Sequence, residues 1–363
     1  MGFRVFIVAG EPSGDRHAAR LMEAIKRREP TAEFFGIGGP AMQAVGLESI
    51  VPFAGMNVNG FWEVLRQYRR LRHAFEHTLR HSQARDYDLF VPVDYPGFNL
   101  RLAEQVRRRG VPVFWYIAPQ LWAWGRWRAR RLAEAVDRLF VVLPFEVEFF
   151  QRLGIEAEFH GHPFLDDPVY ATPPSIEAKN PHQVALLPGS RAHEQRLNLP
   201  LMLRLADALR QRDWALEFTV AIAPRTGGTT PGIRFDDDAQ RVLLRSSYGV
   251  VKAGTSTLEA MLAGVVQVAM YRASFGTYVL GRALVSIPFV ALPNIILGRQ
   301  VVPEVIQTSS AIGRLLRTVE RVLADPDEAA RQREASLQLR RALGEGGASQ
   351  RIADRMLALV GRR

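Results

Sequence analysis

The sequence predicts an α/β protein built from two doubly wound parallel-sheet domains in tandem. Short apolar runs rich in Val, Ile and Phe alternate with amphipathic stretches in both halves of the chain. This alternation is typical of right-handed strand–helix–strand crossovers, which form a parallel sheet covered by helices on both faces. The length of 363 residues favours two domains. Five prolines between positions 163 and 181 interrupt the alternation, so the linker is expected there.

Each half of the chain supplies its own strands. In the first domain, residues 1–165, strands are expected at 5–9, 33–37, 89–93, 113–117 and 139–143. In the second, residues 182–325, they are expected at 184–187, 218–222, 248–252 and 265–271. Residues 326–363 are predicted to form Arg-rich helices that pack back on the first domain or on a partner chain. Because ligands of such sheets bind beyond the carboxyl ends of the strands, a cleft between the two domains is the expected site.

The composition excludes several classes of protein. Hydrophobic residues make up 47% of the chain and charged residues 23%, which excludes wholesale disorder. There is no cysteine, so disulfides, thiolate metal sites and cysteine nucleophiles are excluded. The N-terminal stretch lacks the long apolar core of a signal peptide. The longest weakly charged stretch, 283–297, contains two prolines and falls short of a bilayer span, so no transmembrane helix is expected.

The formal net charge of +10 is concentrated in one region. Residues 66–138 hold 15 arginines against 7 acidic residues, which is +8 of the total. Residues 56–79 place apolar side chains at helical spacing between arginines, a pattern that suits an anionic membrane surface or an ordinary helix packed on a core. Tryptophans at 115, 122, 124 and 127 stand among further arginines. That pattern fits single-stranded nucleic acid, a membrane interface, or burial in the core.

Two features of the first domain can carry chemistry. The glycine turn at 10–15 follows the first strand, and its N–H groups can hold an anion or a sugar hydroxyl. Alternatively, it is a plain turn in which Ser13 or Asp15 caps the following helix. It does not match the Gly-x-Gly-x-x-Gly dinucleotide fingerprint. Asp94 ends another strand, where a carboxylate can act as a general base or accept backbone N–H bonds in its turn.

Two turns of the second domain can bind a phosphorylated sugar. Arg191, beside Gly189 and Ser190, can pair bidentately with a phosphate, although a structural turn is the alternative. The 253–259 turn has the same form, and Glu259 there can accept two ribose hydroxyls or complete a capping box. His162 is expected to line the cleft, and a zinc site is rejected because no acidic ligand stands at metal spacing.

Taken in order, these motifs resemble the lipid-A-disaccharide synthase family, the glycosyltransferases of bacterial lipid A assembly. The resemblance runs from residue 8 to residue 299, and its specificity comes from the joint order of short motifs. They are VAGE with SGD (8–15), GGP with Met42, Gly60 with EVL (63–65), Asp94 with Pro96 and FN (98–99), Pro119 with WAW (122–124), LPFE (143–146), GHP (161–163), LPGSR (187–191) with Glu194, GT with TLE (254–259), and LPN with GR (292–299).

The resemblance implies a GT-B fold, in which two Rossmann-like domains face each other across a cleft. The implied reaction joins UDP-2,3-diacylglucosamine to 2,3-diacylglucosamine 1-phosphate (lipid X), giving a β-1,6 disaccharide 1-phosphate and UDP. An α-linked donor that gives a β product requires inversion by direct displacement at the anomeric carbon. No metal and no cofactor is implied.

The resemblance also implies roles for single residues. Asp94 would be the base that takes the proton of the acceptor hydroxyl, and Arg191 would offset charge on the departing UDP. The residues implied to bind the donor are Gly189, Ser190, Glu194, Thr255, Thr257, Glu259 and Asn294. Those on the acceptor side are Glu11, Ser13 and His162. The residues expected to associate with the membrane are Phe61, Trp62, Leu65, Arg66, Arg69 and Arg70.

The chain departs from the family pattern at several positions around these motifs. They are Tyr95 and Gly97 in place of Ala and Asp, Ala118 and Gln120 in place of Ser, Lys252 with Ala253 where Ser usually precedes the Gly-Thr turn, and a shortened loop at 224–232. These changes bear on acyl-chain preference and rate more than on reaction type.

The expected protein is a cytoplasmic enzyme, peripheral on the inner face of the cytoplasmic membrane. Its expected partners are UDP-2,3-diacylglucosamine, lipid X and an anionic membrane surface, with no nucleic acid, and with a homodimer formed by exchange of C-terminal segments. The alternatives are a UDP-GlcNAc transferase acting on a peptidoglycan lipid precursor, an inactive family member acting as a scaffold, and a nucleic-acid-binding module. The loop-end carboxylates Asp94, Glu11 and Glu259 argue against the last of these.

Overall fold

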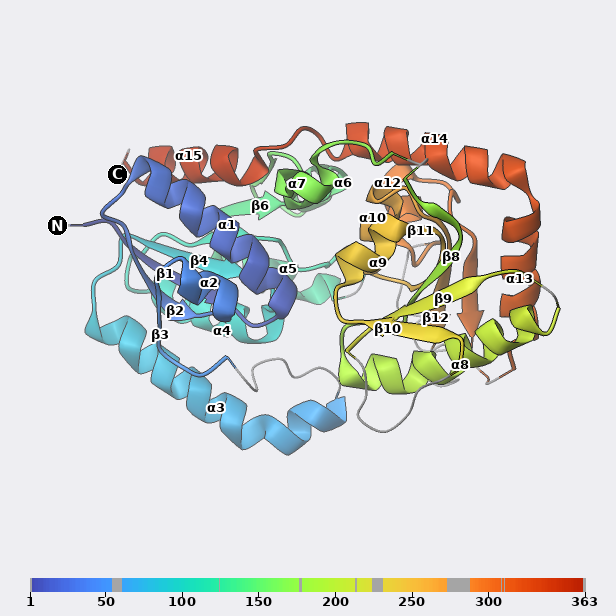
Figure 1. Cartoon of the computed structure of the whole chain (residues 1–363). Coiled ribbons are helices and arrows are strands. Elements are labelled where there is room, and N and C mark those ends of the chain that lie inside the picture. Colours follow the sequence, from blue (N-terminus) through green and yellow to red (C-terminus); the bar gives the residue numbers. More distant parts are fainter. Residues whose placement is uncertain are drawn as a thin grey trace. The chain divides into compact units, whose positions relative to one another are not determined.

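Two units, each with a parallel sheet at its centre, make up the protein. The computed structural model describes residues 2–53, 61–123, 125–175, 178–212, 214–223, 231–272, 288–307, 309 and 311–361, with the side chains of 61–68 left out. Unit 1 comprises residues 1–166 and 345–363, and unit 2 comprises residues 167–344 (Figure 1).

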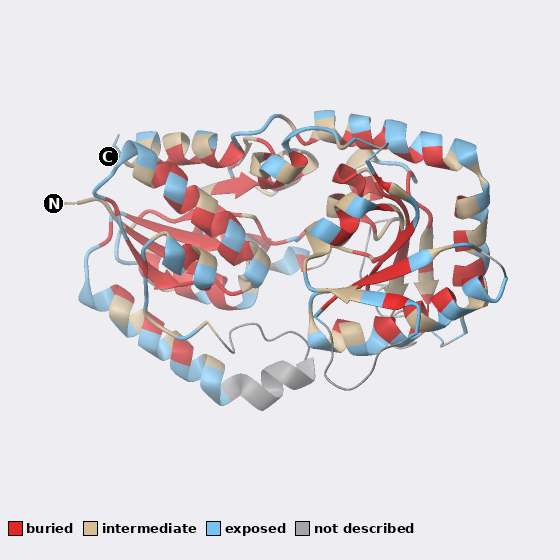
Figure 2. Ribbon diagram, in the orientation of Figure 1, coloured by how far each residue is buried: buried red, intermediate tan, exposed pale blue. Residues whose placement is uncertain are grey.

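The sheet of unit 1 has seven strands in the order β3-β2-β1-β4-β5-β6-β7, and all of its pairings are parallel. The strands are β1 (Arg4–Ala9), β2 (Glu33–Ile37), β3 (Leu47–Ser49), β4 (Leu89–Val93), β5 (Phe114–Tyr116), β6 (Arg138–Val141) and β7 (Ala157–Phe159). The central strands are buried on both faces, as Figure 2 shows, because helices cover each side of the sheet.

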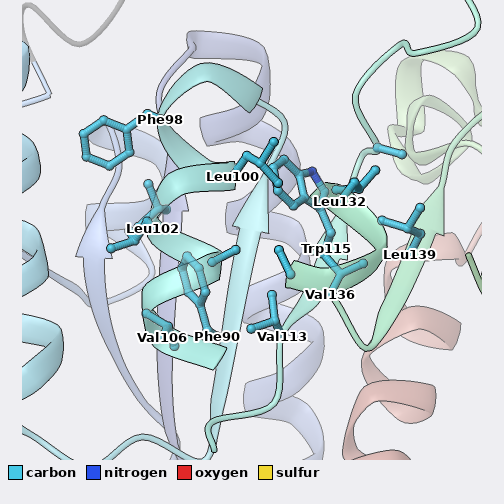
Figure 3. Close-up of a cluster of buried hydrophobic side chains, with 14 of the residues drawn as sticks. Phe90, Phe98, Leu100, Leu102, Val106, Val113, Trp115, Leu132, Val136 and Leu139 are labelled. Carbon is cyan, nitrogen blue, oxygen red and sulfur yellow. The ribbon is translucent and has the colours of Figure 1, made fainter. Parts of the chain in front are cut away.

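Two apolar clusters hold these helices on unit 1. The helices are α1 (Pro12–Arg28), α2 (Pro40–Ala44), α3 (Phe61–Ala84), α4 (Pro96–Arg107), α5 (Ala129–Ala135), α6 (Phe145–Gln151) and α15 (Ala348–Val360). One cluster joins α3, α4 and α5 to the sheet, and Figure 3 shows Phe90, Trp115 and Leu132 within it. The other joins α1 and α15 to the opposite set of strand side chains. Burying each such large side chain contributes about 1.5–3 kcal/mol.

The last helix, α15, returns to unit 1 and packs on α1. Arg28 pairs bidentately with Asp354 at 2.7 and 2.9 Å. The Asp166 carboxylate accepts the N–H groups of residues 347, 348 and 349, which are the first donors of α15, at 2.7–2.8 Å. The segment 326–363, predicted as one piece, is thus divided, since α14 (Pro326–Ala342) belongs to unit 2.

Unit 2 repeats the architecture with six strands in the order β10-β9-β8-β11-β12-β13. The strands are β8 (Asn180–Leu187), β9 (Glu217–Ala221), β10 (Ile233–Asp236), β11 (Ser246–Lys252), β12 (Val266–Arg272) and β13 (Glu304–Gln307). The helices described there are α7 (Pro168–Ala171), α8 (Ala192–Arg210), α9 (Ala239–Arg245), α10 (Thr255–Leu262), α12 (Leu292–Leu297), α13 (Gly313–Ala324) and α14. An apolar cluster from β8, β9, β12, α8 and α13 forms a core.

The predicted strands are all present, within a few residues of their expected bounds. The sequence did not predict β3, β7, β10 or β13, which are three or four residues long and lie at or next to sheet edges, where few apolar residues are needed. The predicted linker contains a 3-10 turn at Pro163–Asp166 and one helical turn, α7, before β8 begins. None of the described helices has the length and apolar character to cross a membrane.

Candidate active site

Each sheet reverses its strand order at one place, and ligands of doubly wound sheets bind beside that place. The reversal lies between β1 and β4 in unit 1, and between β8 and β11 in unit 2. The loops after these strands carry Glu11 and Asp94 in unit 1, and Arg191 and Gly254 in unit 2. The turns predicted from the sequence to carry chemistry therefore follow the four strands that flank the reversal points.

Backbone strain is concentrated at the carboxyl ends of β4 and β5. Throughout the described ranges, positive φ angles outside glycine occur at Asp94 (46°), Tyr95 (52°) and Ile117 (62°). Left-handed backbone is unfavourable for residues with a Cβ, above all for a β-branched one, and it persists where the surrounding structure imposes it. Because such strain clusters at functional sites, it marks this edge of unit 1 as the candidate catalytic edge.

Asn99 holds the strained turn at Asp94 in place. Its fully buried amide donates to the carbonyl oxygens of Asp94 at 2.8 Å, Val8 at 3.2 Å and Val93 at 3.3 Å. The N–H of Asp94 donates to the carbonyl of Tyr116 at 3.1 Å. These bonds join the ends of β1, β4 and β5, so the partly exposed Asp94 carboxylate extends from a backbone fixed by three strands.

Tyr95 covers the glycine turn that follows β1. A Cβ at position 10 would lie 2.4 Å from Tyr95 Cδ1, so only glycine leaves room for the ring there. Burial, and then the nearby Glu11 carboxylate, raises the pKa of Tyr95 to about 12, which keeps its hydroxyl protonated at neutral pH. Glu11 and Ser13 are partly exposed at the start of α1. The predicted acceptor-side pair thus begins the helix next to the Asp94 turn.

Asp15 caps a different helix from the one expected. The N-cap residue of α1 is Glu11, and no side chain caps that helix, so a cap by Ser13 or Asp15 is wrong. The buried Asp15 carboxylate instead accepts the N–H groups of Gly39, Ala41 and Met42, at 2.7–3.1 Å, at the start of α2. It therefore ties the glycine turn after β1 to the one after β2.

No pattern in the sequence indicates that Glu146 is a buried carboxyl group close to Asp94. Glu146, 1% exposed, accepts the indole N–H of Trp122 at 2.8 Å and the backbone N–H of Leu143 at 3.0 Å. Burial raises the pKa of Glu146 to about 7, these two bonds oppose the rise, and the charge of Asp94 adds to it. Trp122 and Glu146 both belong to motifs noted above, but no sequence pattern predicts a contact between residues 24 positions apart.

Glu146→Gln is expected to change how stability depends on pH. Between the ordinary pKa of 4.5 and about 7, folded wild-type protein keeps a proton that the unfolded chain has lost, so its free energy of unfolding falls as pH rises. The fall amounts to roughly 3 kcal/mol, and the variant lacks it. Denaturant unfolding of both proteins at pH 5 and pH 8 measures this. Glu148→Gln, an exposed change in the same helix, is the control, and an equal wild-type-to-variant difference at both pH values would contradict the prediction.

His162 is enclosed within unit 1. It is 5% exposed, and its Nδ1 accepts the N–H of Phe164 at 3.1 Å. Burial lowers the pKa of His162 to about 3, so the ring is neutral. The Phe164 ring centre lies 4.8 Å from that of His162 and 5.5 Å from that of His17, whose pKa burial also lowers. The expected position of His162 on a cleft wall stays a prediction.

The turn after β8 is built around a buried glutamate. Gly189 has a φ of 114°, and a Cβ there would lie 2.4 Å from Glu194 Oε2. The Glu194 carboxylate accepts the backbone N–H of Arg191 at 3.5 Å and a guanidinium N–H of the same residue at 3.3 Å. Lys252 Nζ lies 2.8 Å from Glu194 Oε1. Burial alone would raise the pKa of Glu194, but the Lys252 and Arg191 charges hold it below the ordinary value. Ser190 is exposed on this turn.

The turn after β11 opens α10 through its backbone. Gly254, with a φ of 142°, is the N-cap residue and no side chain caps the helix, so the capping box suggested for Glu259 is absent. Thr255 is exposed at the first helical position, and Glu259 is partly exposed one turn later. Thr257 is fully buried, and its hydroxyl donates to the carbonyl of Gly254 at 2.7 Å. Thr255 and Glu259 are therefore accessible, whereas Thr257 shapes the turn.

Asn294 uses all its hydrogen-bonding capacity inside unit 2. Its Nδ2 donates to the carbonyl of Val302 and to Glu304 Oε1, both at 2.8 Å. Its Oδ1 accepts the N–H groups of Val301 at 2.7 Å and Val302 at 2.8 Å. Glu304 in turn accepts the N–H groups of Val290 and Ala291, which precede α12. This network fixes the segment in which α12 begins.

Part of the candidate membrane surface can be placed. The side chains of Phe61, Trp62, Leu65 and Arg66 lie outside the described residues, whereas Arg69 and Arg70 are exposed on α3. Farther along α3, side chains at helical spacing pack on the core of unit 1, which confirms the core-facing interpretation for that half. They are Leu71, Ala74, Phe75 and Leu79.

The tryptophans of the basic region separate into two groups. Trp115 is fully buried and Trp122 is 8% exposed, so both belong to the interior, whereas Trp127 is 68% exposed. Trp124 lies outside the described residues.

Comparisons with known proteins agree with the motifs. The family model described as lipid-A-disaccharide synthetase matches residues 5–356. A lipid-A-disaccharide synthase of Anaeromyxobacter dehalogenans (strain 2CP-C) is 37% identical over 98% of this chain and 97% of its own. The corresponding protein of Geobacter metallireducens is 35% identical over 99% and 98%.

Solved structures share the fold at low sequence identity. The calicheamicin glycosyltransferase CalG4 superposes with a TM-score of 0.62 at 16% identity, covering 99% of each chain. MurG of Acinetobacter baumannii superposes with a TM-score of 0.59 at 14% identity over 100% of each chain. The predicted GT-B fold class is confirmed. From the end-to-end family match and these relatives, the chain belongs to the lipid-A-disaccharide synthetase family.

Proposed function

We propose that this protein is an inverting hexosyltransferase that forms the lipid A disaccharide. It transfers 2,3-diacylglucosamine from UDP-2,3-diacylglucosamine to the 6-hydroxyl of lipid X, releasing UDP. The observation that carries the proposal is the family match over nearly the whole chain, together with the strained turn of Asp94 and Tyr95, whose Tyr95 ring lies against the glycine turn that carries Glu11.

Asp94 acts as the general base of this reaction. Its carboxylate takes the proton from the acceptor hydroxyl as that oxygen attacks the anomeric carbon. The bond from that carbon to UDP breaks on the opposite face, which accounts for inversion. Support comes from the backbone of Asp94, which three strand ends hold rigid through Asn99 and Tyr116, since a base must be positioned before its proton transfer.

The turns after β8 and β11 bind the donor. Arg191 offsets the negative charge that grows on the departing diphosphate, as positioned donors do without any change in protonation. Ser190 and Thr255 are exposed at the two helix starts, and the partly exposed Glu259 accepts the ribose hydroxyls. Thr257 and Glu194 act indirectly, because their polar atoms bond to residues of these turns. Asn294 acts indirectly through the segment in which α12 begins, which its side chain ties to Val301 and Val302.

The enzyme works at the inner face of the cytoplasmic membrane, where the acyl chains of both substrates are held. Support comes from the exposed arginines of α3 in the chain's most basic region, which suit anionic headgroups. A homodimer formed by exchange of C-terminal segments is a further expectation. The α15–α1 contact, with its Arg28–Asp354 pair, is the contact that such an exchange would re-form between chains.

The purified protein is expected to release UDP when given both lipid substrates. Two acceptor arms and one binding measurement separate the alternatives. Release with lipid X supports the proposal, release only with a peptidoglycan lipid precursor and UDP-GlcNAc would assign the alternative transferase, and absence of UDP binding in calorimetry would favour an inactive scaffold.

Reversing two charges on α3 is expected to weaken membrane binding. Each basic residue near an anionic surface contributes about 1 kcal/mol, so Arg69→Glu with Arg70→Glu is expected to lower binding to phosphatidylglycerol vesicles roughly thirtyfold or more in co-sedimentation. Arg314→Glu with Arg317→Glu, on exposed positions of α13, gives the same change in net charge and serves as the control. Equal losses in both double variants would show that net charge alone drives binding, and would contradict a role for α3.

A further inference from the structure

Lys252 is a cation at the reversal point of unit 2 that no role given above explains. It is the last residue of β11, and its Nζ lies 2.8 Å from Glu194 Oε1. The guanidinium of Arg191 lies 3.3 Å from the same oxygen. Two cations, Arg191 in the loop after β8 and Lys252 at the end of the neighbouring strand β11, thus share one buried carboxylate. The three groups together carry a net charge of +1.

The Lys252 ammonium also lies against the turn that opens α10. A Cβ built on Gly254 would be 3.4 Å from Lys252 Nζ, so the ammonium stands beside the backbone that precedes the first N–H groups of the helix. The side chain is 21% exposed, which leaves it accessible to a small anion. An ammonium has three N–H donors, and within the described ranges its ion-pair partner is Glu194.

The other two lysines of the chain, Lys26 and Lys179, have structural roles that differ from the position of Lys252. Lys179 is buried and donates to three carbonyls at the end of α9, at 2.8–3.3 Å. Lys26 donates to the carbonyl of Val45 at 2.6 Å. Both satisfy backbone acceptors. Lys252 is instead paired with the carboxylate of Glu194, which also binds Arg191. It lies between the turns at Gly189 and Gly254.

We propose that Lys252 binds the diphosphate of the nucleoside diphosphate sugar, with Glu194 as the positioning residue that orients both cations. This inference rests on the proposed function, which supplies UDP as the leaving group. A diphosphate offers several charged oxygens, and a cluster with net positive charge fits it better than a neutral one. Arg191 presents a planar fork and Lys252 a compact point charge, so the two can bind different oxygens of one group.

Calorimetric titration with UDP and with uridine tests the proposal. Lys252→Met is expected to weaken UDP binding about ten- to a hundredfold, the range for losing a hydrogen bond to a charged group. Uridine, which lacks phosphate, is expected to bind the variant as it binds wild type. Lys252→Arg is expected to recover most of the UDP affinity, and Lys26→Met, a lysine change in unit 1, is expected to leave both affinities unchanged.

A double variant separates binding from mere neutralisation of Glu194. If Lys252 serves only to neutralise that carboxylate, Lys252→Met with Glu194→Gln restores UDP affinity, and the proposal is overturned. If Lys252 binds the diphosphate, the double variant stays as weak as Lys252→Met. Parallel losses of UDP and uridine affinity in Lys252→Met would also overturn it. Wild-type protein that binds no UDP would refute the proposed function, whereas wild-type binding with an unaffected Lys252→Met would refute this inference alone.

Discussion

Asp94→Ala is expected to lower the rate of UDP release about 10²- to 10⁴-fold while leaving the fold intact. General-base catalysis contributes typically 10²- to 10⁴-fold. Among the described residues, Asp94 is the carboxylate whose backbone Asn99 and Tyr116 fix at the ends of three strands. The backbone bonds that hold the turn come from Asn99 and Tyr116 and do not involve the Asp94 side chain. The turn is therefore expected to keep these backbone bonds when the Asp94 carboxylate is removed.

Asp94→Asn is the sharper variant, because it keeps the size of the side chain and removes the basic oxygen. It is expected to be as slow as Asp94→Ala in a continuous assay of UDP release with both lipid substrates. Asp86→Asn, an exposed change just before the amino end of β4, is the matched control and is expected to retain full activity. UDP affinity is expected to stay at the wild-type value in all three, since the turns proposed to bind the donor belong to unit 2. Normal turnover by Asp94→Asn would rule out the base.

The central strands and the turns that follow them could be predicted from the sequence because they depend on local patterns. A strand buried on both faces is a continuous apolar run, as in β1 and β4, and the turn that follows it must leave the sheet through glycine or a small polar residue. Edge strands such as β3 and β10 lack this signature, since one side of each faces no further strand.

Contacts between distant turns could not be predicted, because no periodicity or spacing encodes them. Asp15 reaches the start of α2, Glu146 reaches the indole of Trp122, and Lys252 reaches Glu194 across 58 positions. Each pairing follows from strand order, which places side by side the carboxyl ends of β1 and β2, of β5 and β6, and of β8 and β11. The sequence marks the residues of the site as candidates, and only the folded sheet distinguishes those left accessible, such as Thr255, from those used to hold a turn, such as Thr257.

Asn294→Ala is expected to destabilise unit 2 by roughly 3–6 kcal/mol. The change leaves the buried N–H groups of Val301 and Val302 without their acceptor and removes two donors, and each buried polar group left unsatisfied costs about 1–3 kcal/mol. Hydrogen exchange is expected to rise across 290–305, the segment that the Asn294–Glu304 network holds. Asn180→Ala, in the same unit, removes a single exposed bond to the His182 N–H and is expected to cost less than about 1 kcal/mol.

The Asn294 variants also distinguish a positioning role from direct donor binding. Asn294→Asp keeps the acceptors for Val301 and Val302 but places a carboxylate oxygen against the Val302 carbonyl and Glu304, so it too is expected to lower stability. If Asn294 acts through the segment it holds, loss of UDP affinity tracks loss of stability across both variants, and cooling or a stabilising osmolyte restores part of each. A variant that keeps wild-type stability and exchange protection yet fails to bind UDP would show instead that the amide contacts the donor.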